Sequence, residues 1–138
     1  MYQPPVSVLI PTYNQDAYVA VAIESALGQD YPNLQVIVGD DNSPDDTATV
    51  VSRYTGDPRL SYIRNDQNRG RVGNYRKLLY EHAKGEWTLP LDGDDYLYDS
   101  GAVSALVQAS EADNVTLVRG EVVRSVDEKR QGDYSTSH

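Results

Sequence analysis

Short β-branched runs alternate with helical apolar periods along most of this chain, and this alternation limits the folds open to it. The runs predict strands at residues 6–10, 34–39, 60–64 and 87–91, of which the first is typical of a strand buried on both faces and the third of a more exposed strand. The segments between and after them carry apolar side chains three or four positions apart, which predicts helices over residues 16–28, 44–54, 72–84 and 100–112. Strands joined by helices form βαβ units. The predicted fold class is therefore α/β, a mostly parallel open sheet with helices on both faces.

The length of 138 residues suits one domain and leaves no room for a second complete one. Further short apolar runs at residues 115–118 and 121–124 predict the last strands. Beyond them the chain is charged and small, with no apolar period. We therefore expect a domain over residues 1–126 and a flexible C-terminal tail over residues 127–138.

Charge and composition exclude several classes of function. With 21 acidic and 12 basic residues, the net charge of −9 opposes general binding to nucleic acid or to anionic lipid. The absence of cysteine excludes disulfides, zinc–thiolate sites and a cysteine nucleophile. No apolar run approaches the roughly 20 residues that span a bilayer, and the first residues do not resemble a signal peptide. We expect a cytoplasmic protein without an integral membrane segment, with peripheral association at a membrane left open.

The fourth predicted strand ends directly in three carboxylates grouped around one glycine, Asp92-Gly93-Asp94-Asp95. Carboxylates this close repel one another and are costly to desolvate, so their grouping indicates a cation, with a divalent metal as the first hypothesis. The alternative is an acidic surface turn, because Asp and Gly are ordinary turn residues.

Three polar loops follow predicted strands, at residues 11–15, 40–43 and 92–95. In open parallel sheets, ligands bind beyond the carboxyl ends of the strands, near the point where the strand order reverses. The sequence therefore predicts that these loops share one crevice.

Other ligand-binding motifs fail on this sequence. A calcium loop starting at Asp92 would need Gly and Glu where Leu97 and Val103 stand. The loop at residues 11–15 lacks the glycines of a dinucleotide-binding turn, and no phosphate-cradling lysine loop occurs. The Gly-x-x-Gly pattern at residues 70–73 is similar to a nucleic-acid clamp, but the acidic balance opposes that reading.

Four landmarks together resemble the family 2 glycosyltransferases, in that family's order and approximate spacing. They are the strand and loop at residues 8–14, the strand end at residues 36–43, the loop at residues 68–70 with Gly73-Asn74, and the segment from residue 85 into the acidic cluster. The resemblance implies the Rossmann-like GT-A fold, which binds a nucleotide-diphosphate sugar, and an Asp-x-Asp metal motif. It also implies sugar transfer, mostly with inversion, from a donor such as a UDP-sugar. The chain resembles the donor-binding half, a truncated form of the family fold.

The resemblance also implies the nucleoside-binding residues. Pro11, Thr12 and Tyr13 would line the nucleoside pocket, and Asp41, together with Asp40, would bind the base. A carboxylate can accept a hydrogen bond from a ring N–H, and an aromatic ring offers a face for stacking. The alternative for Tyr13 is a loop tyrosine that packs on the next helix.

At the metal end, the resemblance implies that Asp94 binds a Mn²⁺ or Mg²⁺ ion that also grips the diphosphate. Asp92 would approach the ribose, or would reach the metal through a bound water, and Gly93 would let the backbone turn close to the ligand. Asp95 would hold the loop or cap the following segment.

The phosphate-binding arginine of the family would fall near Tyr75, where this sequence departs from the pattern. Arg69, Arg71 and Arg76 lie close by, and we assign Arg71 to the phosphates. The alternative is that each of these arginines is solvated on a loop or a helix face.

The family places its general base well after the metal motif, and no carboxylate before the end of this sequence lies in a matching motif. The catalytic base is therefore unassigned, and the acceptor, whether a glycan, lipid or protein, is unidentified. Two functions remain open. One is a glycosyltransferase, and the other is a nucleotide-sugar-binding module or fragment without transferase activity.

Overall fold

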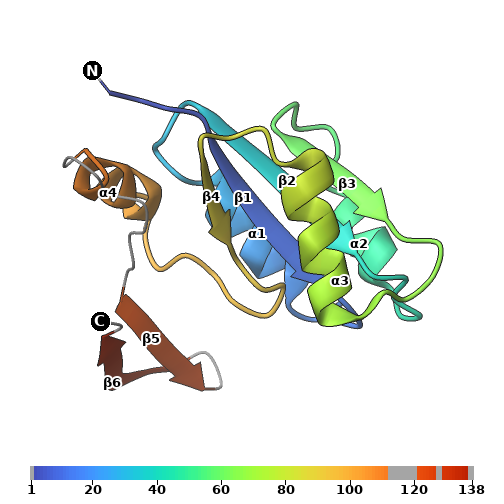
Figure 1. Cartoon of the computed structure of the whole chain (residues 1–138). Coiled ribbons are helices and arrows are strands. Elements are labelled where there is room, and N and C mark those ends of the chain that lie inside the picture. The colour runs from blue at the N-terminus through green and yellow to red at the C-terminus, as the bar shows by residue number, and fades with distance from the viewer. Residues whose placement is uncertain (1, 112–120, 127–128, 137–138) are drawn as a thin grey trace.

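The computed structural model describes residues 2–111, 121–126 and 129–136 and contains a four-stranded parallel sheet (Figure 1). Its strands are β1 (Val6–Thr12), β2 (Leu34–Asp40), β3 (Leu60–Arg64) and β4 (Trp87–Pro90), in the order β3-β2-β1-β4. Each neighbouring pair is parallel, with β1 between β2 and β4. The prediction of a parallel α/β sheet is thus confirmed.

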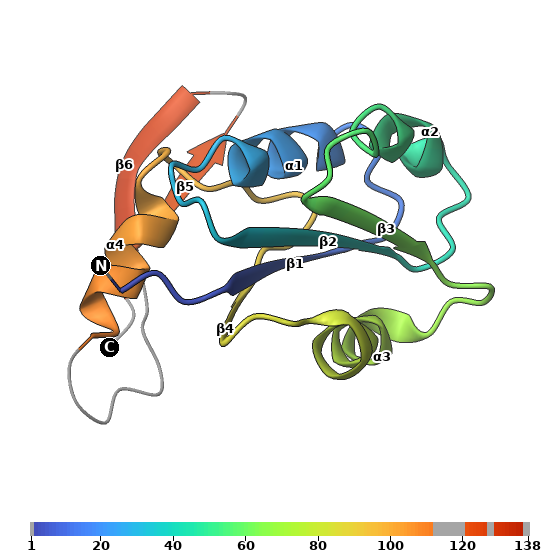
Figure 2. The ribbon, with the colours of Figure 1, turned by 90° about the horizontal axis from the view of Figure 1, so that it is seen from above.

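Helices cover both faces of this sheet. Figure 2 shows α1 (Val19–Leu27) and α2 (Thr47–Ser52) over one face and α3 (Gly70–Lys77) over the other. A π-helical turn, η1 (Leu78–His82), continues α3, and α4 (Ala102–Ala109) follows β4 along the chain.

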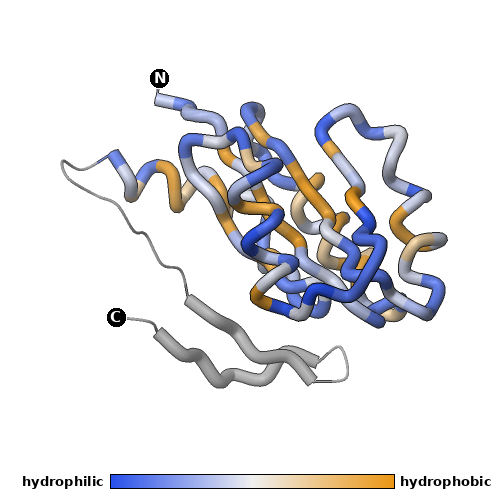
Figure 3. The backbone as a smooth tube through the Cα atoms, turned by 45° about the vertical axis from the view of Figure 1, so that its right-hand side comes forward, coloured by the Kyte–Doolittle hydropathy of each residue, from blue (hydrophilic) through white to orange (hydrophobic). Residues whose placement is uncertain are grey.

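The core has one layer on each face of the sheet because the side chains of β1 alternate. Val6, Val8 and Ile10 pack in the larger cluster with the buried residues of α1 and α4. Leu9 packs on the opposite side with Ile37 and Leu78. Hydrophobic stretches gather in the middle of the tube in Figure 3. The central strands β1 and β2 are buried along nearly their whole length, whereas β3 and β4 are partly exposed.

The helix predicted over residues 72–84 instead begins at Gly70 and widens into η1. The Ala83 amide donates to the Leu78 carbonyl oxygen at 2.9 Å, a bond to the fifth residue back, which marks the π-helical turn. Leu78 is fully buried, and a Cβ at Gly39 would lie 2.7 Å from its methyl carbons. The close approach of helix and strand at this point therefore requires glycine in β2.

The sequence Ser43-Pro44-Asp45-Asp46 has the pattern of a helix start, which predicts Ser43 as the cap of the second helix and Pro44 in its first turn, and this prediction is wrong. The helix begins at Thr47, and the Ser43 hydroxyl instead donates to Asp40 Oδ1 at 2.6 Å. The same hydroxyl accepts from the Asn14 amide at 2.9 Å. Because these tertiary partners take the hydroxyl, it ties the loop after β1 to the turn after β2.

A second, antiparallel sheet contains β5 (Glu121–Val126) and β6 (Lys129–Thr136). The strand predicted at residues 121–124 is confirmed, whereas the one predicted at residues 115–118 lies outside the described residues. Residues 129–136 were expected in a flexible tail but form β6, because backbone pairing with β5 needs no apolar period. The domain boundary at residue 126 stays a prediction. Within the described ranges, no helix has the length and apolar character needed to cross a membrane.

Candidate nucleotide and metal site

A cavity of about 360 Å³ lies at the carboxyl ends of β1, β2 and β4. The chain leaves β1 toward β2 and β3 on one side and returns to β4 on the other, so the strand order reverses beside β1. Its lining residues are Pro11, Thr12, Tyr13, Gln15, Asp41, Asn68, Gly70, Arg71, Asn74, Asp92 and Asp94. Of the residues predicted for binding, all except Asp40 and Gly93 are in this lining.

Asp41 is a buried carboxylate with one oxygen already bonded. Asp41 is only 2% exposed, and its backbone amide donates to the Thr12 carbonyl oxygen at 3.0 Å. Oδ1 accepts from Asn65 Nδ2 at 3.0 Å and from the Arg69 amide at 2.7 Å. No group in the described ranges donates to Oδ2, and Asp41 is one of the lining residues of the cavity. Tyr13, with 48% exposure, adds an aromatic ring to the same lining.

Asp40 lies behind the cavity and is fully buried. Its Oδ1 accepts from the Ser43 amide at 2.9 Å, and its Oδ2 accepts from the Tyr62 hydroxyl at 2.5 Å. Arg64 approaches Oδ2 at 3.6 Å. Because both oxygens are engaged, Asp40 holds the turn after β2, and its predicted contact with the base has no support in this structure. Burial and the bond to Asp40 raise the pKa of Tyr62 to about 12.

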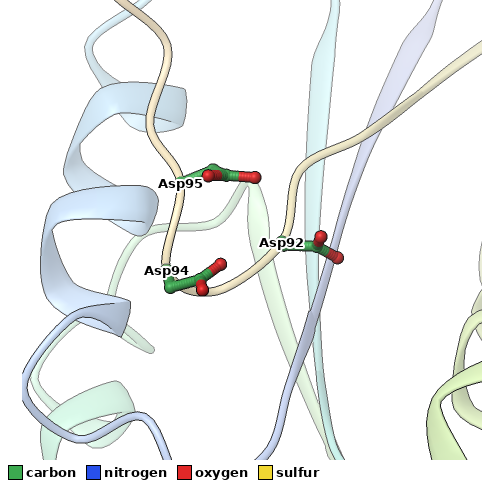
Figure 4. Close-up of side chains that lie close together, drawn as sticks. All are labelled: Asp92, Asp94 and Asp95. Atoms are coloured by element: carbon green, nitrogen blue, oxygen red, sulfur yellow. The ribbon is translucent and has the colours of Figure 1, made fainter. Parts of the chain in front are cut away.

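The acidic cluster contains Asp92, Asp94 and Asp95, whose carboxylate groups lie together in the loop after β4 (Figure 4). One oxygen from each lies within 4.8 Å of the others, and the Asp95 amide closes the turn on the Asp92 carbonyl at 2.9 Å. Desolvation, followed by the charges of Asp94 and Asp92, raises the pKa of Asp95, which Arg71 partly opposes. Carboxylate oxygens are the hard donors that divalent ions prefer, and Asp92 and Asp94, which line the cavity, would present such an ion to it.

Gly93 packs tightly against the end of β1 and the loop that follows it. Its amide donates to the Pro11 carbonyl at 3.0 Å, which fixes the acidic loop to the end of β1. A Cβ here would lie 2.3 Å from Gln15 Oε1 and 2.6 Å from Thr12 Oγ1. The position therefore requires glycine because two segments of the chain approach each other closely here. The sequence predicts a close approach at Gly93, but to the ligand; the structure shows one to Thr12 and Gln15.

Arg71 extends from the first turn of α3 toward the acidic loop. Its Nη2 donates to Asp92 Oδ2 at 2.7 Å, and its side chain is 82% exposed. Arg76 instead lies over the Tyr80 ring, 5.6 Å from its centroid. Among the three arginines considered from the sequence, the described cavity lining contains Arg71. Its role toward phosphate stays a prediction.

The amides around Asp41 were missed as functional residues. Asn68 and Asn74 line the cavity, and Asn65 bonds Asp41 from behind it. Two signals were available in the sequence. Asn65 directly follows the third predicted strand, at the edge where the ligand is expected. Asn74 lies inside a predicted helix, although asparagine is a poor helix former.

A parallel sheet with a polar crevice at its strand-order reversal is the arrangement in which open α/β domains bind nucleotides. The sequence matches the family described as Glycosyl transferase family 2 over residues 7–137. The chain belongs to this family, and its four-stranded sheet matches part of the GT-A fold.

Curated relatives and solved structures agree with this assignment. The GalNAc(5)-diNAcBac-PP-undecaprenol beta-1,3-glucosyltransferase of Campylobacter jejuni is 42% identical over 107 residues, which are 76% of this chain and 34% of that protein. The UDP-Glc:alpha-D-GlcNAc-diphosphoundecaprenol beta-1,3-glucosyltransferase WfaP of Escherichia coli is 37% identical over 66% of this chain and 36% of its own. This chain thus spans about a third of the length of these two relatives.

Two solved structures share the fold. The mannosyltransferase PcManGT of Pyrobaculum calidifontis, in complex with GDP-Man and Mn²⁺, superposes with a TM-score of 0.77 at 28% identity. The match covers 83% of this chain and 34% of that one. TarS residues 1–349 of Staphylococcus aureus, in complex with UDP-GlcNAc, give a TM-score of 0.69 at 31% identity, over 79% of this chain and 32% of that one.

Proposed function

We propose that this chain is the donor-binding part of a glycosyltransferase that takes a UDP-sugar with a Mn²⁺ or Mg²⁺ ion and inverts the anomeric carbon. The single observation that carries the proposal is the shared cavity. Residues from the ends of β1, β2 and β4 provide an aromatic ring, a buried carboxylate and paired aspartates to one space.

The nucleoside end of the proposed site is formed by Tyr13 and Asp41. The ring of Tyr13 is exposed enough to stack on a base, and Asp41 Oδ2, to which no described group donates, would accept a hydrogen bond from a base N–H. Because Oδ1 is held by two donors, the carboxylate needs little reorganisation when a base arrives.

The diphosphate end is formed by Asp92, Asp94 and Arg71. The two aspartates would hold the metal ion, and the ion would stabilise the negative charge that develops on the departing nucleoside diphosphate. Arg71 would exchange its contact with Asp92 for a phosphate oxygen, since guanidinium groups pair readily with either anion. Gly93 keeps the backbone of this loop against β1, so that both aspartates stay beside the cavity.

The acceptor is left open in this proposal. The names of two relatives contain undecaprenol diphosphate, whereas another relative, TarS, is a poly(ribitol-phosphate) beta-N-acetylglucosaminyltransferase at 36% identity. Relatives of similar identity thus differ in acceptor. Peripheral location at a membrane would follow if this protein shared an undecaprenol-linked acceptor.

A nucleotide-sugar-binding module without transfer is the second candidate, and one observation favours it. The acids in the cavity lining of the described chain are Asp41, Asp92 and Asp94, all of which the donor and metal would occupy. None is then free to deprotonate an acceptor hydroxyl, the step that a general base must perform.

Calorimetric titration of the protein with UDP, with and without Mn²⁺, tests the proposal. We expect Mn²⁺ to strengthen UDP binding, and we expect Asp94→Ala to abolish that gain while leaving metal-free binding similar. Asp66→Ala is the matched control because it removes the same exposed charge outside the cavity lining.

Release of UDP from UDP-glucose and UDP-N-acetylglucosamine then separates the two candidates. Metal-dependent binding with donor turnover supports the transferase, whereas binding without turnover on any acceptor supports the module. Absence of UDP binding would refute both, and an Asp94→Ala variant that kept the Mn²⁺ effect would refute the metal assignment.

A further inference from the structure

A buried chain of amides connects Asp41 to a lysine outside the cavity. Asn65 and Asn74 are 2% and 3% exposed, and Asn65 Nδ2 donates to Asp41 Oδ1 at 3.0 Å and to Asn74 Oδ1 at 3.1 Å. Asn74 Nδ2 donates in turn to the Gly39 carbonyl at 2.9 Å. At the other end, Lys77 Nζ donates to Asn65 Oδ1 at 3.0 Å. Both N–H groups and the oxygen of the Asn65 side-chain amide are therefore hydrogen-bonded.

Lys77, Asp41 and Asn74 together select which way the Asn65 amide faces. If that amide were turned over, its oxygen would face two acceptors, Asp41 Oδ1 and Asn74 Oδ1, and its NH₂ group would face the lysine ammonium. Both contacts would be repulsive, so the ammonium and the carboxylate select the same amide orientation from opposite sides. Lys77 ends α3, is half-buried and is absent from the cavity lining, and within the described ranges its side chain is linked to the cavity through its hydrogen bond to Asn65.

The two hydrogen bonds at Asp41 Oδ1 limit which hydrogen-bonding edge of a base this carboxylate can accept. With Oδ1 taken by Asn65 and the Arg69 amide, Oδ2 remains as one acceptor. Uracil presents one ring N–H between two carbonyl oxygens, which suits a single acceptor. Cytosine presents a ring nitrogen acceptor at the same place, which would oppose a carboxylate oxygen. Guanine presents two adjacent donors that would compete for the occupied Oδ1.

We propose that Lys77 is a positioning residue that sets base selectivity by holding Asn65, and through it Asp41, in the orientation that accepts uracil. This inference rests on the proposed donor site. It assigns a role to a residue outside the lining of the cavity.

The test is the ratio of dissociation constants for CDP and UDP, measured by calorimetry with Mn²⁺ on the full chain. Lys77→Met keeps the aliphatic stem and removes the donor, and we expect the ratio to fall about fivefold, the size of one hydrogen bond's contribution. Arg76→Met is the matched control, since it removes the same charge from the neighbouring residue, which lies over Tyr80 and outside the amide chain. Its ratio should equal that of the wild type.

The ratio separates positioning from a merely structural role. CDP and UDP share their diphosphate, so lost folded protein or lost positive charge weakens both equally and leaves the ratio unchanged. Asn65→Ser, which breaks the chain nearer Asp41, should lower the ratio at least as much. A Lys77→Met ratio within twofold of the wild type, or a wild-type ratio near one, would overturn the inference. A wild-type protein that binds neither nucleotide would instead overturn the proposed function.

Discussion

Replacing Gly93 with alanine tests how the acidic loop is held against β1. The added Cβ would lie 2.3 Å from Gln15 Oε1, 2.6 Å from Thr12 Oγ1 and 2.8 Å from Thr12 Cβ. The glutamine oxygen ends a flexible side chain and can move away. Thr12 cannot, because it is buried at the end of β1 and paired in the sheet with Asp40. The loop itself must therefore shift.

The cost follows from two contributions. Overpacking a tight contact typically costs about 1–3 kcal/mol, and moving Gln15 breaks its 2.7 Å bond from Thr12 Oγ1, which adds about 1 kcal/mol. We expect Gly93→Ala to lower the free energy of unfolding by about 2–4 kcal/mol. A domain with a stability of about 5–15 kcal/mol would stay folded.

Urea denaturation followed by fluorescence provides the measurement, because Trp87 is the single tryptophan and lies in β4, which leads into this loop. Gly56→Ala is the matched control, since a Cβ there meets nothing within 4 Å, and we expect a change within about 0.5 kcal/mol. Mn²⁺-dependent UDP binding should weaken in Gly93→Ala alone, because the shift separates Asp92 and Asp94. Equal stability in the two variants would refute the close-approach argument.

Two further predictions concern charge. Arg71→Gln should weaken UDP binding about tenfold. It should also tighten Mn²⁺ binding measured without nucleotide, because the guanidinium 2.7 Å from Asp92 no longer competes for that carboxylate. Weaker Mn²⁺ binding in titration calorimetry would contradict this prediction. The pKa of Tyr62 is raised from 10.0 to about 12, so its contribution to stability should be complete below pH 10 and lost as the pH rises through 12. Difference absorbance titration of wild type against Tyr62→Phe should place this tyrosinate near pH 12, and ionisation near pH 10 would be the contrary result.

The sheet was predictable from the sequence because its signals are local. Continuous β-branched runs and apolar periods of three or four residues mark buried strands and amphipathic helices wherever they occur. The crevice was predictable for a related reason, since the carboxyl ends of parallel strands meet at one edge. Both inferences need only the order of elements along the chain.

Features that depend on tertiary partners were not predictable in this way. Ser43 has the pattern of a helix cap, but its hydroxyl donates to Asp40 and accepts from the Asn14 amide instead of capping the helix. Asp40 and Asp41 are adjacent acids in the sequence. Only the strand's alternation and the network behind it make one structural and the other available to the cavity. The link from Lys77 to Asn65 joins residues that no short motif connects.

The two ends of the cavity differ in how firmly the chain holds them. At the nucleoside end, Asp41 is buried and bonded before any ligand arrives, so little ordering cost remains when a base binds. At the diphosphate end, Asp94 and Asp95 are exposed, and Asp92 is paired with an arginine that is itself 82% exposed. An exposed ion pair contributes at most about 1 kcal/mol, so it yields readily to a divalent ion or a phosphate. Base selectivity can therefore be set in advance by the fold, whereas the geometry around the diphosphate is completed by the ligands themselves.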